Sequence, residues 1–230
     1  MQSPNHGVAL LLSRFNHAAA PGDPRNEQQL ENFRELRRLY RSIPASFADS
    51  SGIFLARQAH FDLVRAGSAL YGINPTPGAR NPMLPVIELT ARIVQVREAA
   101  APSAHDGGKN GGKSGGKNSN KNGSGAKRRM RLALVSLGHA DGYPRPANSS
   151  AKPMQVMIGG QRCPVAAAPT IDLLPIDVTG LDRSVARFGA TVTLIGDGIG
   201  IDDLAAASES TGREILSRLG NRFHRIYYAT

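Results

Sequence analysis

The residues best suited to chemistry lie in two short segments of the chain. Residues 61–75 read FDLVRAGSALYGINP and contain Arg65 and Gly67, while residues 138–143 read GHADGY and contain His139. An imidazole can take up and release a proton near neutral pH, so His139 is a candidate proton carrier. Considered alone, each residue also has an ordinary interpretation: an ion-pair arginine, a turn glycine and a loop histidine.

The formal charge of +10 over 230 residues is concentrated in one stretch. Residues 102–131 hold eight lysines and arginines and one aspartate, so they carry +7 of that charge. Gly107–Asn122 within this stretch consists of four similar four-residue units, GGKN, GGKS, GGKN and SNKN. Glycine, serine, asparagine and lysine bury too little apolar surface to repay the entropy of ordering, so residues 102–128 are predicted to be a disordered insert.

The insert has two interpretations. It is a flexible, self-repelling linker, or it is a basic arm for phosphate-rich partners, anchored at residues 127–131. It contains no aromatic residue that could stack on bases. Unspecific, salt-sensitive binding is therefore the most that it offers, and nucleic acid is not an expected partner.

The remaining composition points to the cytoplasm. The single cysteine, Cys163, excludes an intrachain disulfide and fits a reducing compartment. The apolar run Val8–Leu12 is too short for a membrane span or for the apolar core of a signal peptide. We therefore expect a cytoplasmic protein without a membrane partner.

Residues 1–75 alternate between strand-like and helix-like patterns. Val8–Leu12 is typical of a short strand buried on both faces of a parallel sheet. A helix is predicted from Asn26, which stands at capping-box spacing from Gln29. Further strand-and-loop units are predicted at residues 45–52 and 63–72. A complete eight-stranded barrel needs about 250 residues, so this pattern indicates a fragment of a β/α barrel.

Residues 76–230 are predicted to form a mainly antiparallel β domain. Residues 85–98 and 130–137 alternate apolar and polar side chains, and Gly159-Gly160 is predicted to form a tight hairpin turn between strands at 154–158 and 162–165. Thr211 and Glu214 form a capping box that opens a short helix, which ends at Gly220. Two further strands are predicted at residues 171–178 and 190–195.

The order of the motifs resembles alanine racemase, a pyridoxal-phosphate enzyme that interconverts L- and D-alanine. The resemblance covers the end of the family's barrel and all of its β domain. It implies an α/β barrel fragment at residues 1–75, followed by the family's antiparallel β domain at residues 76–230. The segments that carry the resemblance are residues 9–29, 46–52, 61–75, 138–143, 163–172 and 211–216.

In the barrel part, the resemblance implies a site for pyridoxal phosphate. Arg65 matches the arginine that keeps the pyridine nitrogen of the cofactor unprotonated. Ser50 matches the hydroxyl that meets the phosphate, and Gly67 and Ser68 match positions whose backbone N–H groups bind it. Asp49 replaces an asparagine of the family, which brings a carboxylate near the phosphate unless the side chain turns away.

In the β domain, the resemblance implies a substrate site. His139 occupies the position of the tyrosine that serves as one of the two catalytic bases. Ile171 and Asp172 match a Met-Asp pair whose methionine N–H contacts the substrate. Arg213 stands where the family has a tyrosine that touches the phosphate, and a guanidinium can bind the same group. No metal site is predicted.

The family reaction needs a lysine that carries the cofactor. The chain has none before Lys109. We therefore expect a truncated racemase that is inactive alone and acts on alanine as a homodimer or with a complementary N-terminal half. Its D-alanine would enter cell-wall peptidoglycan. The alternative is a non-catalytic or vestigial binding protein with the basic insert as an unspecific interaction arm, which is favoured by five altered positions: Arg14, Asp49, His139, Ala168 and Arg213.

Overall fold

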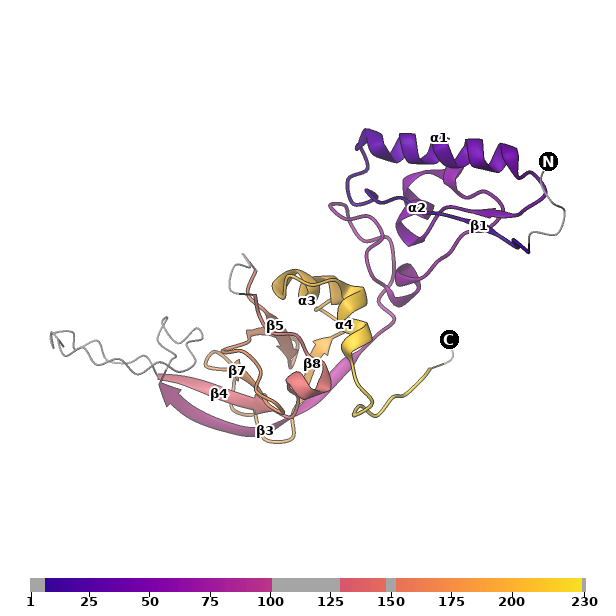
Figure 1. Ribbon diagram of the computed structural model, residues 1–230. Helices are drawn as coiled ribbons and strands as arrows, with labels where there is room; N and C mark the ends of the chain where they lie inside the picture. The colour runs from indigo at the N-terminus through magenta and orange to yellow at the C-terminus, as the bar shows by residue number, and fades with distance from the viewer. Residues whose placement is uncertain (1–6, 101–128, 148–151, 229–230) are drawn as a thin grey trace, which may run out of the picture. The chain divides into compact units, whose positions relative to one another are not determined.

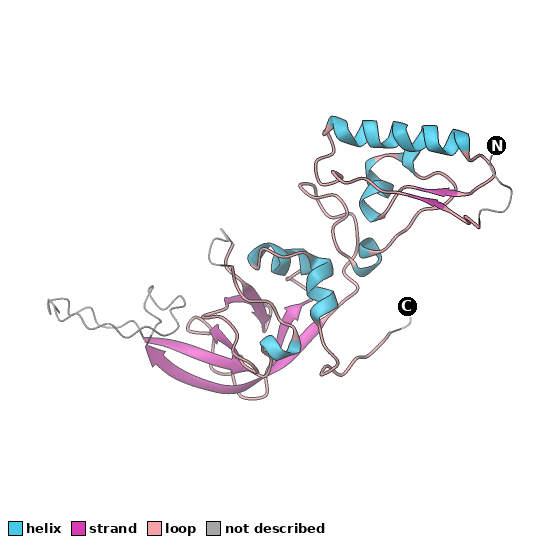
Figure 2. Ribbon diagram, viewed as in Figure 1, coloured by secondary structure: helices cyan, strands magenta, loops and turns pink. Residues whose placement is uncertain are grey.

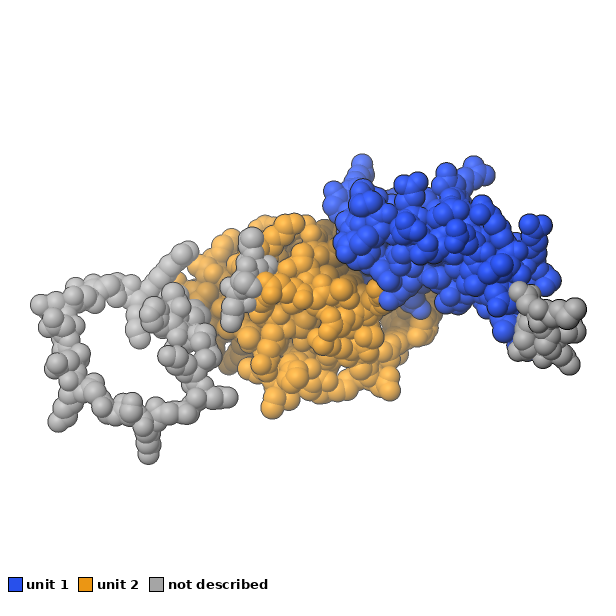
Figure 3. Space-filling model, turned by 45° about the horizontal axis from the view of Figure 1, so that its top comes forward, with its two compact units in different colours: residues 1–87 blue, residues 88–230 orange. Residues whose placement is uncertain are grey.

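The computed structural model describes residues 7–100, 129–147 and 152–228, and the chain divides into two compact units (Figures 1 and 3). Unit 1 comprises residues 1–87 and unit 2 residues 88–230. The predicted domain boundary at residue 75 stays a prediction, and the predicted disordered insert at 102–128 lies outside the described residues. Within the described ranges, no helix has the length and hydrophobicity that crossing a membrane requires.

Unit 1 combines short parallel strands with helices. Strand β1 (Leu11–Leu12) pairs in parallel with β2 (Ala45–Ser46), and a single parallel bridge joins Asp49 to Arg65. The predicted unit at residues 63–72 contains a 3-10 turn in place of a regular strand. The helical elements are α1 (Pro24–Leu39), α2 (Ser50–Leu55), η1 (Arg57–Ala59) and η2 (Ser68–Tyr71).

Helix α1 begins at Pro24, two residues before the predicted start at Asn26. Asp23 is the N-cap, and its carboxylate accepts a hydrogen bond from the Arg25 N–H at 3.0 Å. Pro24 follows as the first helical residue, where its missing N–H leaves no bond unmade. The predicted cap at Asn26 is wrong, because this buried side chain instead donates to two loop carbonyls.

The core of unit 1 is an aromatic cluster. The ring of Phe47 lies 4.7 Å from that of Phe15 and 4.9 Å from that of Phe33, measured between centroids. Phe61 lies 5.0 Å from Phe33 in an edge-on arrangement. Aromatic rings bury a large apolar area, and edge-on pairs add a specific attraction. The cluster therefore holds α1 against the two strands.

Unit 2 is built on a six-stranded antiparallel sheet in the order β6-β5-β8-β3-β4-β7 (Figure 2). The predicted antiparallel β domain is confirmed. A single antiparallel bridge joins Val165, which directly follows β6, to Ile176 in β7, so the two outermost strands of the sheet approach each other at this point. The strands are β3 (Leu89–Ala100), β4 (Arg129–Val135), β5 (Gln155–Ile158), β6 (Gln161–Pro164), β7 (Leu174–Asp177) and β8 (Thr191–Ile195).

Local sequence rules account for most connections in unit 2. Gly159 and Gly160 have φ angles of 55° and 77°, as a tight two-residue hairpin turn requires, so the predicted turn is confirmed. Thr211 caps helix α4 (Gly212–Arg218) by accepting from the Glu214 N–H at 3.2 Å, which is one half of the predicted capping box. The Glu214 carboxylate accepts instead from the Ser210 hydroxyl at 2.7 Å. Helix α3 (Ile201–Ala207) is not among the predicted elements, although its buried residues Ile201, Leu204 and Ala205 have helical spacing.

Candidate functional site

Arg65 spans the carboxyl ends of both strands of unit 1. Its Nη1 donates to the carbonyl and the hydroxyl of Ser46, at 3.0 and 2.6 Å, and its Nη2 donates to the carbonyl of Ser13 at 2.6 Å. Ser46 ends β2, and Ser13 directly follows β1. Ligands of α/β proteins bind at this end of parallel strands. The Nε–H of Arg65 has no acceptor among the described residues, so this donor of the fixed head group is available to a ligand.

Ser50 organises a second polar position in unit 1. Its buried hydroxyl accepts from the backbone N–H groups of Gly67, at 2.9 Å, and Ala69, at 3.2 Å. The N–H of Ser68, between them, has no acceptor within the described part of the chain. Unpaired N–H groups at the start of a helical turn carry partial positive charge, so this position suits an anion.

Asp49 does not oppose such an anion directly. Its carboxylate accepts a hydrogen bond from the Gly52 N–H at 3.1 Å and serves as the N-cap of α2. Aspartate and asparagine cap helices about equally well, so an aspartate is compatible with the local fold. Arg14 is exposed and makes no hydrogen bond or ion pair with any described residue.

His139 begins the 3-10 turn η3 (His139–Asp141), which lies against the segment before β7. The His139 N–H donates to the carbonyl of Thr170 at 2.9 Å, and the next N–H donates to the carbonyl of Ile171 at 2.9 Å. Gly138 packs so closely that a Cβ there would collide with the peptide between Ile171 and Asp172. The structure thus brings together three predicted site residues, His139, Ile171 and Asp172, all with exposed side chains.

Tyr143, four residues after His139, does not take over the role of an exposed base. It is 2% exposed, and its hydroxyl is buried without a hydrogen-bond partner among the described residues. Burial raises the pKa of this phenol above its usual range, which keeps the phenol neutral and protonated.

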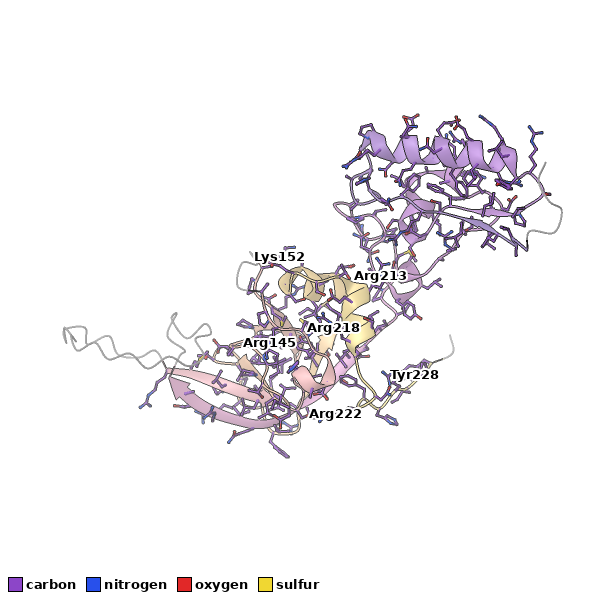
Figure 4. The ribbon with its side chains drawn as sticks, in the orientation of Figure 1. Arg145, Lys152, Arg213, Arg218, Arg222 and Tyr228 are labelled. Carbon is purple, nitrogen blue, oxygen red and sulfur yellow. The ribbon has the colours of Figure 1, made fainter. Side chains whose placement is uncertain are left out.

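The remaining predicted site residue, Arg213, stands on α4 with an exposed side chain (Figure 4). Its guanidinium has no described hydrogen bond or ion pair. Each unit therefore carries its own group of predicted site residues: Arg65, Ser50, Gly67 and Ser68 in unit 1, and His139, Ile171, Asp172 and Arg213 in unit 2.

Sequence reasoning missed several residues that shape these two groups. Ser13 and Ser46 hold the Arg65 head group, and Ala69 shares the Ser50 hydroxyl. Ser13 directly follows the apolar strand β1, so its position at a strand end could have been read from the sequence, whereas Ser46 is the last residue of the two-residue strand β2. The partners of Arg65 could not be read in this way, because they lie far from it along the chain.

Two family models match the chain. One, described as "Alanine racemase, N-terminal domain", matches residues 1–75, and the other, "Alanine racemase, C-terminal domain", matches residues 113–227. The chain belongs to the alanine racemase family.

Individual alanine racemases agree with this assignment. The enzyme of Methylobacterium nodulans is 41% identical over 218 residues, which cover 95% of this chain and 55% of that protein. The "Alanine racemase, biosynthetic" of Agrobacterium fabrum is 37% identical over 226 residues, covering 95% and 54%. The chain thus spans about half the length of the curated relatives it matches.

Solved alanine racemases share the fold. The biosynthetic alanine racemase of Pseudomonas aeruginosa matches with a TM-score of 0.76 at 30% identity, covering 96% of this chain and 57% of that one. The alanine racemase of Bartonella henselae, solved "with covalently bound pyridoxal phosphate", matches with a TM-score of 0.74 at 28% identity, covering 96% and 55%. The alanine racemase fold, a barrel domain followed by an antiparallel β domain, is therefore shown. The fragment interpretation stays a prediction, as do the roles of single residues.

Proposed function

We propose that this chain takes part in the family reaction, the pyridoxal-phosphate-dependent interconversion of L- and D-alanine that supplies D-alanine to the cell wall. The observation that carries the proposal is the placement of Arg65. Its guanidinium is fixed at the carboxyl ends of two parallel strands, and its Nε–H has no acceptor among the described residues. It shares unit 1 with the anion-binding position around Ser50 and Ser68.

The residues of unit 1 fit the two polar ends of the cofactor. The Ser50 hydroxyl and the Ser68 N–H would hold its phosphate, which favours unpaired N–H groups. The free Nε–H of Arg65 would face the pyridine nitrogen. A guanidinium donates hydrogen bonds and accepts none, so it leaves that nitrogen unprotonated. In unit 2, the exposed guanidinium of Arg213 is itself suited to binding a phosphate.

The residues of unit 2 fit the substrate. Pyridoxal phosphate, when bound, withdraws electrons from an amino acid joined to it and acidifies the α-hydrogen. His139 would move a proton at an imidazole nitrogen on one face of the α-carbon. The N–H of Ile171 has no acceptor among the described residues, so it would donate to the substrate carboxylate beside His139.

We propose that the lysine that carries the cofactor comes from another polypeptide. Unit 1 contains no lysine, and Lys152 is the one lysine within the described ranges. The additional polypeptide would be a complementary half or a second subunit. Unit 1 offers surface for it: β1 pairs with one strand only among the described residues, and Leu12, Leu63 and Val64 are 60%, 49% and 42% exposed.

Complementation tests the proposal. The part of the Methylobacterium nodulans relative that this chain does not match is co-expressed with the chain, and racemisation of L-alanine is followed by polarimetry. We expect activity from the assembled pair and from neither part alone. His139→Ala should lower the rate about 100-fold, since a positioned proton carrier contributes at least that factor. His224→Ala, at an exposed histidine of the same unit, should not change it.

The tyrosine variant separates this proposal from the vestigial alternative. If the assembled pair is inactive with His139 and becomes active with His139→Tyr, the chain has lost its base and the alternative is supported. If His139 supports turnover that His139→Ala abolishes, histidine is established as a working base. An assembled pair that is inactive in all three forms would contradict the proposed function.

A further inference from the structure

Asp141 is a buried carboxylate directly beside the site of unit 2. It is 7% exposed, and it ends the turn that His139 begins. A buried carboxylate is costly unless both of its oxygens have partners. Its Oδ2 accepts from the Gly138 N–H at 2.8 Å, and its Oδ1 forms an ion pair with Arg222, whose Nε lies 3.2 Å away. One oxygen therefore closes the turn, and the other ties it to the C-terminal segment.

The C-terminal segment packs against the turn through its backbone as well. The N–H of Gly220 donates to the carbonyl of Asp141 at 3.3 Å. A Cβ at Gly142 would collide with the carbonyl of Arg218, so that position requires glycine. Arg218 and Arg222 are both labelled in Figure 4. The turn is thus held between this segment on one side and the segment before β7, with its carbonyls at 170 and 171, on the other.

Every backbone N–H from residue 138 to residue 142 is hydrogen-bonded. The acceptors are the Asp141 carboxylate and the carbonyls of residues 170, 171, 138 and 139, taken in order along the turn. An imidazole is shorter than the phenol that the family carries at this position. The position of a shorter side chain is set more directly by the position of its backbone. A displacement of about 1 Å at a reacting group can lower the rate 100-fold, so the backbone of the turn must be held in place.

We propose that Asp141 and Arg222 are positioning residues for His139. The Asp141 carboxylate holds the turn that carries the His139 imidazole. The Arg222 guanidinium links that carboxylate to the C-terminal segment, so the position of the turn depends on this segment. This inference deepens the proposed function and rests on it for the role of His139. Neither residue reaches the substrate in this scheme, since both act through the backbone of the turn.

Hydrogen–deuterium exchange of the full chain tests the structural part. In Arg222→Ala, the peptide that covers residues 136–143 should exchange about tenfold faster, because the buried Asp141 carboxylate loses its charged partner. Arg222→Lys should restore slow exchange. The control Arg183→Ala removes an arginine that pairs with Glu98 in the same unit and should leave this peptide unchanged. Unchanged exchange in Arg222→Ala would overturn the proposal.

A double-mutant cycle in the complemented enzyme tests the catalytic part. Arg222→Ala should lower kcat about tenfold and leave KM unchanged when His139 is present. In the His139→Ala background it should have no further effect, because the residue acts through His139. Equal losses in both backgrounds would show a purely structural role and overturn the positioning. If the complemented enzyme is inactive, the proposed function fails while the exchange measurement still decides how the turn is held.

Discussion

Arg65 joins strand ends that are far apart in the sequence. It reaches Ser46, 19 residues away, and Ser13, 52 residues away, through separate nitrogens of one planar head group. The rigid fork of a guanidinium suits this task, because it presents several N–H groups in fixed directions. The same bonds leave its Nε facing no described acceptor. One side chain therefore stabilises unit 1 and offers a ligand contact.

The first prediction concerns Arg65→Lys. A lysine carries one ammonium group and cannot bridge both strand ends in the geometry of the fork. We expect the free energy of unfolding to fall by about 1.5–3 kcal/mol, the contribution of one hydrogen bond to a charged group. Urea unfolding of the full chain measures this change. Arg14→Lys, at an exposed arginine one residue after Ser13, is the control and should stay within about 0.5 kcal/mol. Equal effects in both variants would contradict the bridging role.

At the scale of elements, the cap of α1 predicts a pH dependence. The hydrogen bond from the Arg25 side chain, together with that from its N–H, lowers the pKa of Asp23 below its usual range. A carboxyl whose pKa is lowered on folding contributes stability above its unfolded pKa of about 3.9. The contribution is lost as the pH falls through the lower folded value.

Asp23→Ala should therefore lower the thermal midpoint by a few degrees at pH 7, through loss of the cap. The difference from the unchanged chain should shrink as the pH is lowered well below 4. Glu35→Ala, at an exposed carboxylate on the same helix, should show neither effect. A deficit that persists undiminished at low pH would rule out the ionised cap as its cause.

The β3–β4 hairpin makes a prediction about the basic insert. Residues Ala100 and Arg129 are directly paired, so the ladder is intact up to the last described residues on both strands. Replacing residues 101–128 by Asn-Gly, which favours a two-residue hairpin turn, should leave the thermal midpoint within a few degrees. A deeper replacement that also removes three strand pairs should destabilise the sheet. Loss of folding in the first variant would show that the insert contributes to the fold.

At the scale of the whole molecule, the distribution of lysines predicts how the chain alone treats pyridoxal phosphate. Four of the five predicted cofactor contacts, Arg65, Ser50, Gly67 and Ser68, lie in unit 1, which contains no lysine. After incubation with the cofactor and reduction with borohydride, peptide mapping should find label spread over several lysines with no dominant site. Addition of the complementary half should direct the label to one lysine of that half. A single dominant adduct on this chain, accompanied by racemisation, would refute the prediction.

The sequence by itself determined the family, the types of most elements and the candidate residues. Strand alternation, the Gly159-Gly160 turn and the Thr211 cap are local signals, because each depends on residues a few positions apart. The predicted start of α1 at Asn26 is wrong for a local reason as well. Asp23 caps the helix and Pro24 favours its first position, and together they are a stronger start signal than the pattern at Asn26. These features could be read without knowing how the chain packs.

Only the tertiary structure decided which residues meet. The bonds from Arg65 to Ser13, from the His139 turn to Ile171 and from Arg222 to Asp141 each join segments separated by many residues. Such contacts arise when hydrophobic burial brings helices and strands together, and neither periodicity nor capping patterns encode the partner across the gap. The candidate functional residues could therefore be predicted from the sequence, whereas the packing of each unit determined the geometry in which they can act.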